Sequence, residues 1–383
     1  MKRTLSNPAV KIILGLLLGV GLLLLISRFV NFADSLSVIQ QHLLTPRGIL
    51  FALLGGCSFL TAFAIRGVRW RLFLNAVGSI RVITAIRIAF ISIFLNFLLV
   101  TGSGEIARAL ILKRTANIPI SRSLPTIAMD RSLDLLPALG IIAIVPFLGL
   151  QLDFKIWIVL ALVVGLLCGL ICFIGLTVWK RTVAIMVLHK ISSLFPKKLG
   201  KKIEDFATNL VDSLIVAASH PKAFLPAIVL TCLALLCDGL FAMFIFWAIG
   251  LPISFRMAIF GYTVFNMYTI LPTPPGQLGS NEAVGLLIFT GLLHLPAAKV
   301  TAMFVVSHPW AALLMSTAGL ISMKTLGLTL TMTLKMEPQE SPVEEPLALP
   351  LDIPLKANYI EIIDDDPDIT EKLTAVRLRS TPV

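Results

Sequence analysis

Residues 257–293 read MAIFGYTVFNMYTILPTPPGQLGSNEAVGLLIFTGLL, an apolar stretch interrupted in its middle by proline, glycine and polar residues. Its apolar parts, Met257–Leu271 and Ala283–Leu293, are each shorter than the about 20 residues that a helix needs to cross a bilayer. Irregular backbone is tolerated at membrane depth only where protein or a water-filled cavity surrounds it. We therefore predict a re-entrant helical hairpin, formed by two short helices that enter and leave the membrane on one side.

A second interrupted stretch lies earlier in the chain. Ile88–Val100 and Ile106–Leu112 flank the sequence TGSGE at 101–105, and neither flank is long enough to cross the membrane alone. The same reasoning predicts a second re-entrant hairpin here.

Six other stretches are apolar over a full membrane thickness. They are Ile12–Phe32, Ile49–Ile65, Leu133–Leu150, Ile156–Val178, Ala223–Ile249 and Ala298–Met323. The first follows a basic start but no small-x-small cleavage site follows it, so we interpret it as an uncleaved span. The 383 residues are 57% apolar and 14% charged, with a mean hydropathy of +0.93, which excludes an ordinary soluble enzyme. The sequence predicts an all-α polytopic membrane protein with about six spans and two hairpins.

Positive charge indicates the orientation of these spans. With the N-terminus inside, the segments expected in the cytoplasm hold 23 Lys and Arg residues and those expected outside hold 5. This bias predicts a multi-pass protein of the cell inner membrane with both termini in the cytoplasm. It also favours anionic lipids as partners and gives no reason to expect nucleic acid.

The order of the segments suggests an internal repeat. A span, a hairpin and a span at 49–150 are followed by the same series at 223–323, in the opposite orientation. Phe94-Leu95-Asn96 precedes the first glycine-rich turn, and Val264-Phe265-Asn266 precedes the second. We expect one membrane domain over residues 1–336, with an inverted repeat inside it.

Two segments lie outside the predicted spans and hairpins. Residues 180–222 combine the basic run KKLGKK at 197–202 with an amphipathic pattern, which suits either a helix on the inner membrane surface or a connector packed on the protein. Residues 337–383 are rich in proline and acidic side chains, and we expect a disordered cytoplasmic tail.

The first hairpin contains the charged pair Glu105 and Arg108, three residues apart after Gly104. A charge near the bilayer centre costs about 2.5 to 3.5 kcal/mol, so each calls for a partner or a function. Two interpretations stay open. An anionic group such as phosphate could bind at the helix N-terminus with Arg108, or Glu105 and Arg108 could form a salt bridge that only holds the hairpin.

The second hairpin presents Pro275 and Gly276 in its turn, and Asn281 and Glu282 where its second helix begins. Glu282 could contact a cation, a proton or a lipid head group, or it could only cap the helix.

Four further charged residues are candidates for the same site. Asp130, Arg131 and Asp134 begin a span, with Arg131 and Asp134 spaced to pair, and they could instead only anchor the helix. Asp238 lies far inside a span, where a carboxylate is costly. His308 marks a proline kink, and a buried histidine with satisfied hydrogen bonds is favoured there over a proton relay.

Arginines also follow directly after the span 49–65. We interpret Arg66, Arg69 and Arg71, together with Trp70, as a basic belt at the inner membrane interface.

These motifs resemble a known family. Gly102-Ser103-Gly104-Glu105-Ile106-Ala107-Arg108, then Asp130-Arg131-Ser132-Leu133-Asp134, then residues 271–282 are similar in kind and order to the flippase-like integral membrane family, whose domain also forms the membrane region of bacterial lysylphosphatidylglycerol synthases. The resemblance covers roughly residues 10–330. It implies the lipid-translocating part alone, because a tail of this length cannot be the large cytosolic domain of the aminoacyl-transferring members.

We therefore expect a lipid flippase or transporter that moves or binds a lipid with an anionic or glycosylated head group. The alternative is an intramembrane transferase or an accessory membrane subunit, partnered with a lipid-modifying enzyme. No nucleophile triad, phosphate-binding loop, metal-ligand spacing or dinucleotide fingerprint occurs in the sequence, so we expect no enzyme activity, no cofactor and no metal. The five cysteines lie in apolar segments and are interpreted as small core residues.

Overall fold

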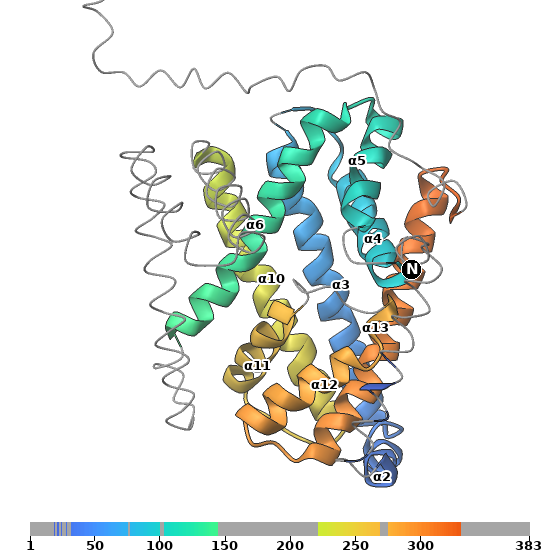
Figure 1. The fold of residues 1–383 in the computed structure, drawn as a ribbon, viewed down its shortest axis with the longest axis vertical. Helices are drawn as coiled ribbons and strands as arrows, with labels where there is room; N and C mark the ends of the chain where they lie inside the picture. Colours follow the sequence, from blue (N-terminus) through green and yellow to red (C-terminus); the bar gives the residue numbers. More distant parts are fainter. Residues whose placement is uncertain are drawn as a thin grey trace, which may run out of the picture. The chain divides into compact units, whose positions relative to one another are not determined.

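The computed structural model describes residues 32–75, 77–99, 103–144, 221–268 and 275–330, together with a few single positions between 19 and 28. All regular structure in these residues is helical (Figure 1). In chain order the helices are α2 (Phe32–His42), α3 (Pro46–Leu74), α4 (Val82–Leu98), α5 (Ser103–Ala116), α6 (Ile120–Ile144), α10 (Pro221–Ala248), α11 (Phe255–Met267), the short turn η3 (Pro275–Gln277), α12 (Ser280–Leu286), the π-helical η4 (Leu287–Leu292) and α13 (Ala297–Thr325).

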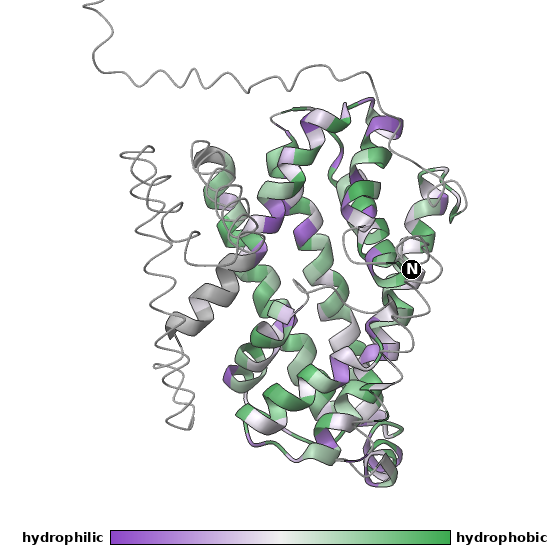
Figure 2. Cartoon of the chain, in the orientation of Figure 1, coloured by the Kyte–Doolittle hydropathy of each residue, from purple (hydrophilic) through white to green (hydrophobic). Residues whose placement is uncertain are grey.

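Three helices are long and apolar enough to cross a membrane. They are α3, α13 and, within α10, residues Ala223–Ala248. Figure 2 shows the apolar residues along these helices. The predicted spans at 49–65, 223–249 and 298–323 are therefore confirmed as apolar helices of spanning length.

Other predicted segments are covered in part or not at all. Helix α6 contains the start of the predicted span 133–150, but it begins already at Ile120. The rest of that span, the predicted spans at 12–32 and 156–178, the connector 180–222 and the tail 337–383 lie outside the described residues.

Helices α3 and α10 run antiparallel and form the most extensive helix pair. Phe51 of α3 meets Trp247 of α10 edge to face, with ring centroids 5.2 Å apart. One turn further along α3, Gly55 lies against Ile245, and the absence of a side chain lets the two helices approach closely. This register places the C-terminal third of α3 beside the middle of α10.

The two interrupted stretches form pairs of short helices. Helices α4 and α5 replace the predicted flanks 88–100 and 106–112, while α11 and α12 with η4 replace 257–271 and 283–293. Three residues of the second turn have a positive φ, namely Gly276 (65°), Gln277 (54°) and Gly279 (73°). This backbone favours glycine and explains why the turn interrupts the helix. The re-entrant path of both pairs and the inverted repeat stay predictions.

Candidate functional site

The arginines after residue 65 lie inside a helix. Helix α3 continues to Leu74, and the side chains of Arg66 and Arg69 are only 21% and 1% exposed. The predicted basic belt is therefore wrong for these two residues. The physical reason is that carboxylates on α6 and α10 neutralise them inside the protein.

Arg69 joins three helices through its guanidinium group. Its Nε donates to Asp130 Oδ1 at 2.8 Å and its Nη2 to Asp134 Oδ1 at 2.7 Å, both on α6. Its Nη1 donates to the Thr231 hydroxyl of α10 at 3.1 Å. These bonds satisfy a fully buried cation from all sides.

Arg108 reaches the same carboxylate from α5. Its Nη1 donates to Asp130 Oδ2 at 3.1 Å, and its guanidinium carbon lies 4.9 Å from the centroid of the Trp70 ring. A cation over an indole face is attracted by the ring's negative surface. The predicted Glu105–Arg108 salt bridge is thus replaced by an Arg108–Asp130 pair.

Glu105 turns to Arg131 on α6, whose guanidinium donates to Glu105 Oε1. Asn96 fixes this carboxylate, because its side-chain amide donates to Glu105 Oε1 at 3.1 Å and its oxygen accepts from the Gly104 N–H at 2.8 Å. The short helix α5 cannot span a membrane. Burial opposes ionisation of Glu105, but the nearby Arg131 and Arg108 outweigh it and hold the pKa of its carboxyl below the ordinary value.

Three further pairs complete the set, and one of them joins Arg66 Nε to Asp134 Oδ1 at 4.0 Å. Arg131 donates to Asp134 Oδ2 at 3.3 Å, which confirms the predicted i, i+3 pair. Arg66 binds Asp238 of α10 with both terminal nitrogens, at 2.5 and 3.3 Å. The carboxylate inside the apolar α10 is thereby explained.

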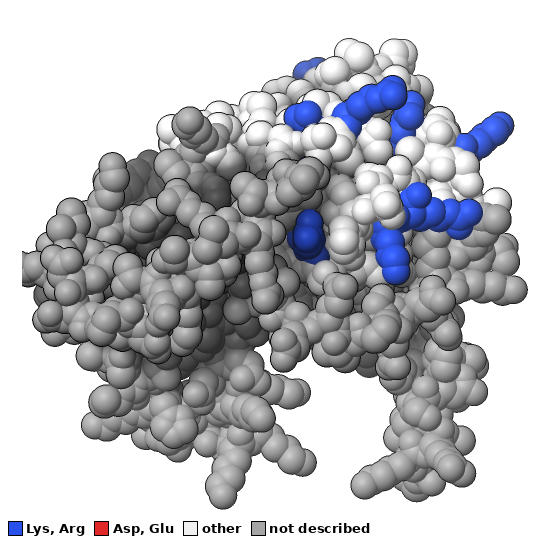
Figure 3. Space-filling view, turned by 90° about the horizontal axis from the view of Figure 1, so that it is seen from above, with Lys and Arg blue, Asp and Glu red and all other residues white. Residues whose placement is uncertain are grey.

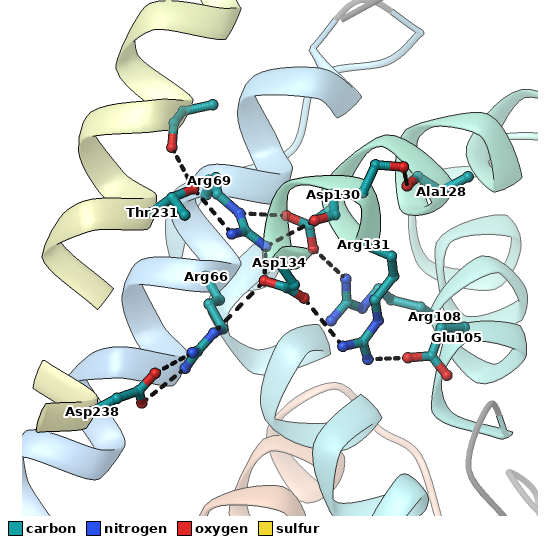
Figure 4. A network of polar contacts seen from close by, with 12 residues as sticks. Arg66, Arg69, Glu105, Arg108, Ala128, Asp130, Arg131, Asp134, Thr231 and Asp238 are labelled. Atoms are coloured by element: carbon teal, nitrogen blue, oxygen red, sulfur yellow. Dashed lines mark hydrogen bonds and ion pairs between the residues drawn. The ribbon is translucent and has the colours of Figure 1, made fainter. Parts of the chain in front are cut away.

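Together these residues form what we call the charge network. It consists of Arg66, Arg69, Glu105, Arg108, Asp130, Arg131, Asp134 and Asp238 (Figure 4). Its four cations and four anions cancel when all are ionised. Side-chain exposure rises from 1% at Arg69 to 29% at Asp134 and 46% at Arg131, so the network is accessible at its Arg131 side.

A second polar group lies where the turn 275–279 meets α13. His308 Nδ1 is 2.7 Å from Glu282 Oε1, and its Nε2 is 2.8 Å from the carbonyl oxygen of Gly276. Asn281 and Glu282 are buried, at 9% and 8% exposure. Glu282 therefore does more than cap its helix, and Pro275 and Gly276 serve by shaping the turn.

The C-terminal end of α4 connects the two polar groups. Asn96 holds Gly104 and Glu105 of the charge network. Phe97, the next residue, meets the His308 ring edge to face, with centroids 6.1 Å apart. The end of α4 and the turn 275–279 thus lie close together, with His308 between them.

Known proteins identify the family. Residues 12–319 match the family described as the lysylphosphatidylglycerol synthase TM region. The chain belongs to this family. With its long apolar helices, this makes it a multi-pass membrane protein.

One curated relative is the glycosyltransferase AglD of Haloferax volcanii. The two sequences are 24% identical over 357 residues, which cover 84% of this chain and 55% of the relative. The chain therefore spans about half the length of that protein. No solved structure matches this member of the lysylphosphatidylglycerol synthase TM region family.

The sequence analysis named most residues of the charge network as candidate site residues, but it missed Arg66 and Arg69. It also missed Asn96, which holds Glu105. Arg66 and Arg69 are three residues apart and therefore lie on one face of α3, so their spacing could have indicated that both belong to one site. Among the described residues, no group of three or more His, Cys, Asp or Glu side chains is arranged to hold a metal ion.

Proposed function

We propose that this protein binds a lipid with an anionic or glycosylated head group and moves it across the membrane, and that the charge network receives the head group. In this proposal both interrupted stretches are re-entrant hairpins of an inverted repeat, and both termini lie in the cytoplasm of a cell with the protein in its inner membrane.

The proposal rests mainly on Arg131, which is half-exposed and lies at the accessible side of the network. Arg131 holds Glu105 and Asp134, while Arg108 and Arg69 lie buried behind them. An anionic group that pairs with Arg131 would replace a carboxylate without leaving any arginine uncompensated. Sugar hydroxyls could donate to the same two carboxylates.

Unused hydrogen-bonding groups support this assignment. Glu105 Oε2 and Arg108 Nε are buried and, within the described part of the chain, have no hydrogen-bond partner. A buried polar atom without a partner is costly, and a bound ligand is one explanation for its retention. The network is therefore arranged to gain contacts when a polar head group enters.

A basic end of the helix bundle supports the proposed orientation. Figure 3 shows Lys and Arg side chains on this face, and no Asp or Glu side chain is visible among the described residues there. The ends of α4, α5, α6 and α13 contribute exposed basic residues, namely Arg81, Lys113, Arg114, Arg122 and Lys324. Such an end suits the anionic cytoplasmic leaflet.

The second function to consider is an intramembrane transferase or an accessory subunit of a lipid-modifying enzyme, because the relative from Haloferax volcanii is named a glycosyltransferase. A general base needs a carboxylate that takes up a proton readily. Glu105 has the opposite property, since its arginine neighbours lower its pKa. This argues against Glu105 as a general base.

The test uses the full chain in liposomes that contain fluorescent phosphatidylglycerol or a fluorescent glycolipid. Wild-type protein should expose inner-leaflet lipid to a membrane-impermeant quencher. Arg131→Ala should slow this movement by about tenfold or more, because a charge-assisted contact is lost. Arg122→Ala removes the same charge from an exposed position on the same helix and should leave the rate unchanged.

Equal rates for empty liposomes and wild-type protein would contradict the transport proposal. Equal rates for Arg131→Ala and wild type would remove the charge network from it. If mass spectrometry instead finds a chemically modified lipid, the transferase alternative is correct.

A further inference from the structure

His308 is held at both nitrogens of its ring. Its Nδ1 contacts Glu282 Oε1 at 2.7 Å and its Nε2 contacts the Gly276 carbonyl oxygen at 2.8 Å. The side chains of His308 and Glu282 are only 8% and 10% exposed. One imidazole therefore joins α13 both to the turn 275–279 and to the first turn of α12.

These two contacts fix the number of protons on the pair. A carbonyl oxygen can only accept a hydrogen bond, so Nε2 must carry a hydrogen. Nδ1 then either donates to an ionised Glu282 or accepts from a protonated Glu282. Both arrangements place two protons on the pair and leave it without net charge.

Loss of one proton is incompatible with keeping both contacts. If the remaining hydrogen is on Nε2, a nitrogen lone pair faces the Glu282 carboxylate. If it is on Nδ1, a lone pair faces the Gly276 carbonyl. Either arrangement is repulsive, and the pair then carries one negative charge in a buried place.

The surroundings give that negative charge little support. Within the described residues, Glu282 Oε2 and Asn281 Oδ1 are buried without a hydrogen-bond partner. The edge of the Phe97 ring from α4 faces His308, and Tyr268 at the end of α11 is a titratable group that faces Glu282. Among the residues that the structure describes, no cation lies in contact with the pair.

Other charged or titratable groups lie on the helices packed against α13. They are Asp34 and His42 on α2, Arg47, Cys57, Arg66, Arg69 and Arg71 on α3, Arg87 on α4, and Cys232, Cys237 and Asp238 on α10, besides Lys299 and Lys324 of α13 itself. No described hydrogen bond or ion pair joins any of them to His308 or Glu282. The proton count is thus decided by the pair and the turn.

We propose that His308 and Glu282 form a proton-binding site, and that release of one of its two protons to water frees the turn 275–279 from α13. This inference rests on the proposed lipid transport, for which it supplies the coupling ion. Phe97 contacts the pair and the neighbouring Asn96 holds Glu105, so a movement of the turn reaches the charge network through α4.

The experiment measures how accessible the turn is at different pH values. Full-length protein carrying Gln277→Cys and Ser254→Cys is reconstituted in liposomes and treated with a maleimide, and labelling at each position is quantified by peptide mass spectrometry. Ser254 is exposed and forms the N-cap of α11. Because ionisation of a thiol raises its labelling rate at either position, the rate at 277 is divided by the rate at 254, and this ratio reports opening of the turn. Release of one proton predicts that this ratio rises about tenfold per pH unit while the closed form dominates.

Three variants make the result specific to the pair. Glu282→Gln can donate its amide hydrogen to Nδ1 of a neutral His308, so the ratio should stay low and flat with pH. His308→Gln cannot hold both partners, and the ratio should stay high and flat. His42→Gln on α2 is the matched control and should keep the wild-type slope.

A flat wild-type ratio between about pH 5 and pH 9, or a wild-type slope in both pair variants, would overturn the proton-binding site. Lipid movement is measured in the same liposomes. A pH-dependent ratio without lipid movement would contradict the proposed transport and leave the proton site standing. Lipid movement with a flat ratio would contradict the proton site alone.

Discussion

Asp130 is the residue on which the charge network depends most. Its two carboxylate oxygens separate Arg69 from Arg108, at 2.8 and 3.1 Å, and its side chain is only 3% exposed. Two guanidinium groups without this carboxylate would face each other in a buried place. Breaking a buried ion pair from one side is costly, since the remaining charge keeps its desolvation penalty and loses its attraction.

We therefore expect Asp130→Asn to lower the free energy of unfolding by about 3 to 5 kcal/mol. The measurement is thermal unfolding of the purified protein in detergent. Asp34→Asn on α2 neutralises an exposed carboxylate and should unfold like wild type. An unchanged unfolding temperature for Asp130→Asn would mean that the two arginines do not depend on this counterion.

The sequence singled out most residues of the network but predicted only one of the observed pairs. Asp130, Arg131, Asp134 and Asp238 stood out because charge is rare in apolar segments. The spacing rule correctly paired Arg131 with Asp134, because both lie on one helix. It could not pair Arg108 with Asp130 or Arg66 with Asp238, since those contacts depend on how separate helices pack.

At the scale of elements, the junction of α4 and α5 shows why this stretch breaks. Gly104 lies in the first turn of α5, and a Cβ there would collide with the carbonyl oxygen of Ser92 on α4. The Asn96 side-chain oxygen accepts a hydrogen bond from the backbone N–H of Gly104. The sequence predicted this break from its glycines, but the close helix contact that requires Gly104 depends on the packing of α4.

We expect Gly104→Ala to destabilise the protein by about 1 to 3 kcal/mol, because overpacking forces the two helices apart. Gly140→Ala is the matched control, since a Cβ there has no atom within 4 Å and alanine favours a helix by about 0.5 to 1 kcal/mol. Both variants are compared by thermal unfolding. If Gly104→Ala is as stable as Gly140→Ala, the two helices do not need their close approach.

At the scale of the whole membrane part, the described helices have two distinct ends. The N-termini of α4 and α6 and the C-termini of α3 and α5 meet in one apolar cluster, which includes Leu74, Ile80 and Ile118. The opposite end contains the start of α3 and the link from α10 to α11, where Lys299 donates to the Gly250 carbonyl at 3.5 Å. The length of α3 separates the two ends by roughly 43 Å, enough to cross a bilayer.

The positive-inside bias was counted on segments expected to be loops, and the structure shows that some of the counted arginines lie in helices and form ion pairs. Arg66, Arg69, Arg108 and Arg131 belong to the 23 residues assigned to the cytoplasm, yet they are paired in the charge network. The remaining basic residues still favour the end that carries Lys113 and Arg122. The predicted orientation therefore rests on fewer charges, but on ones that are free of the network.

Two serine positions test this orientation directly. Ser121 is exposed at the basic end, and Ser254 is exposed at the opposite end, where it caps the N-terminus of α11. We expect Ser121→Cys to react with a membrane-impermeant maleimide only in inverted membrane vesicles, and Ser254→Cys only in intact cells, because the basic end should face the cytoplasm. Reaction of both from one face would show that α3 does not cross the membrane as its length and hydropathy indicate. Exchange of the two faces would instead place the basic end outside, and the head group would then enter the charge network from the opposite side.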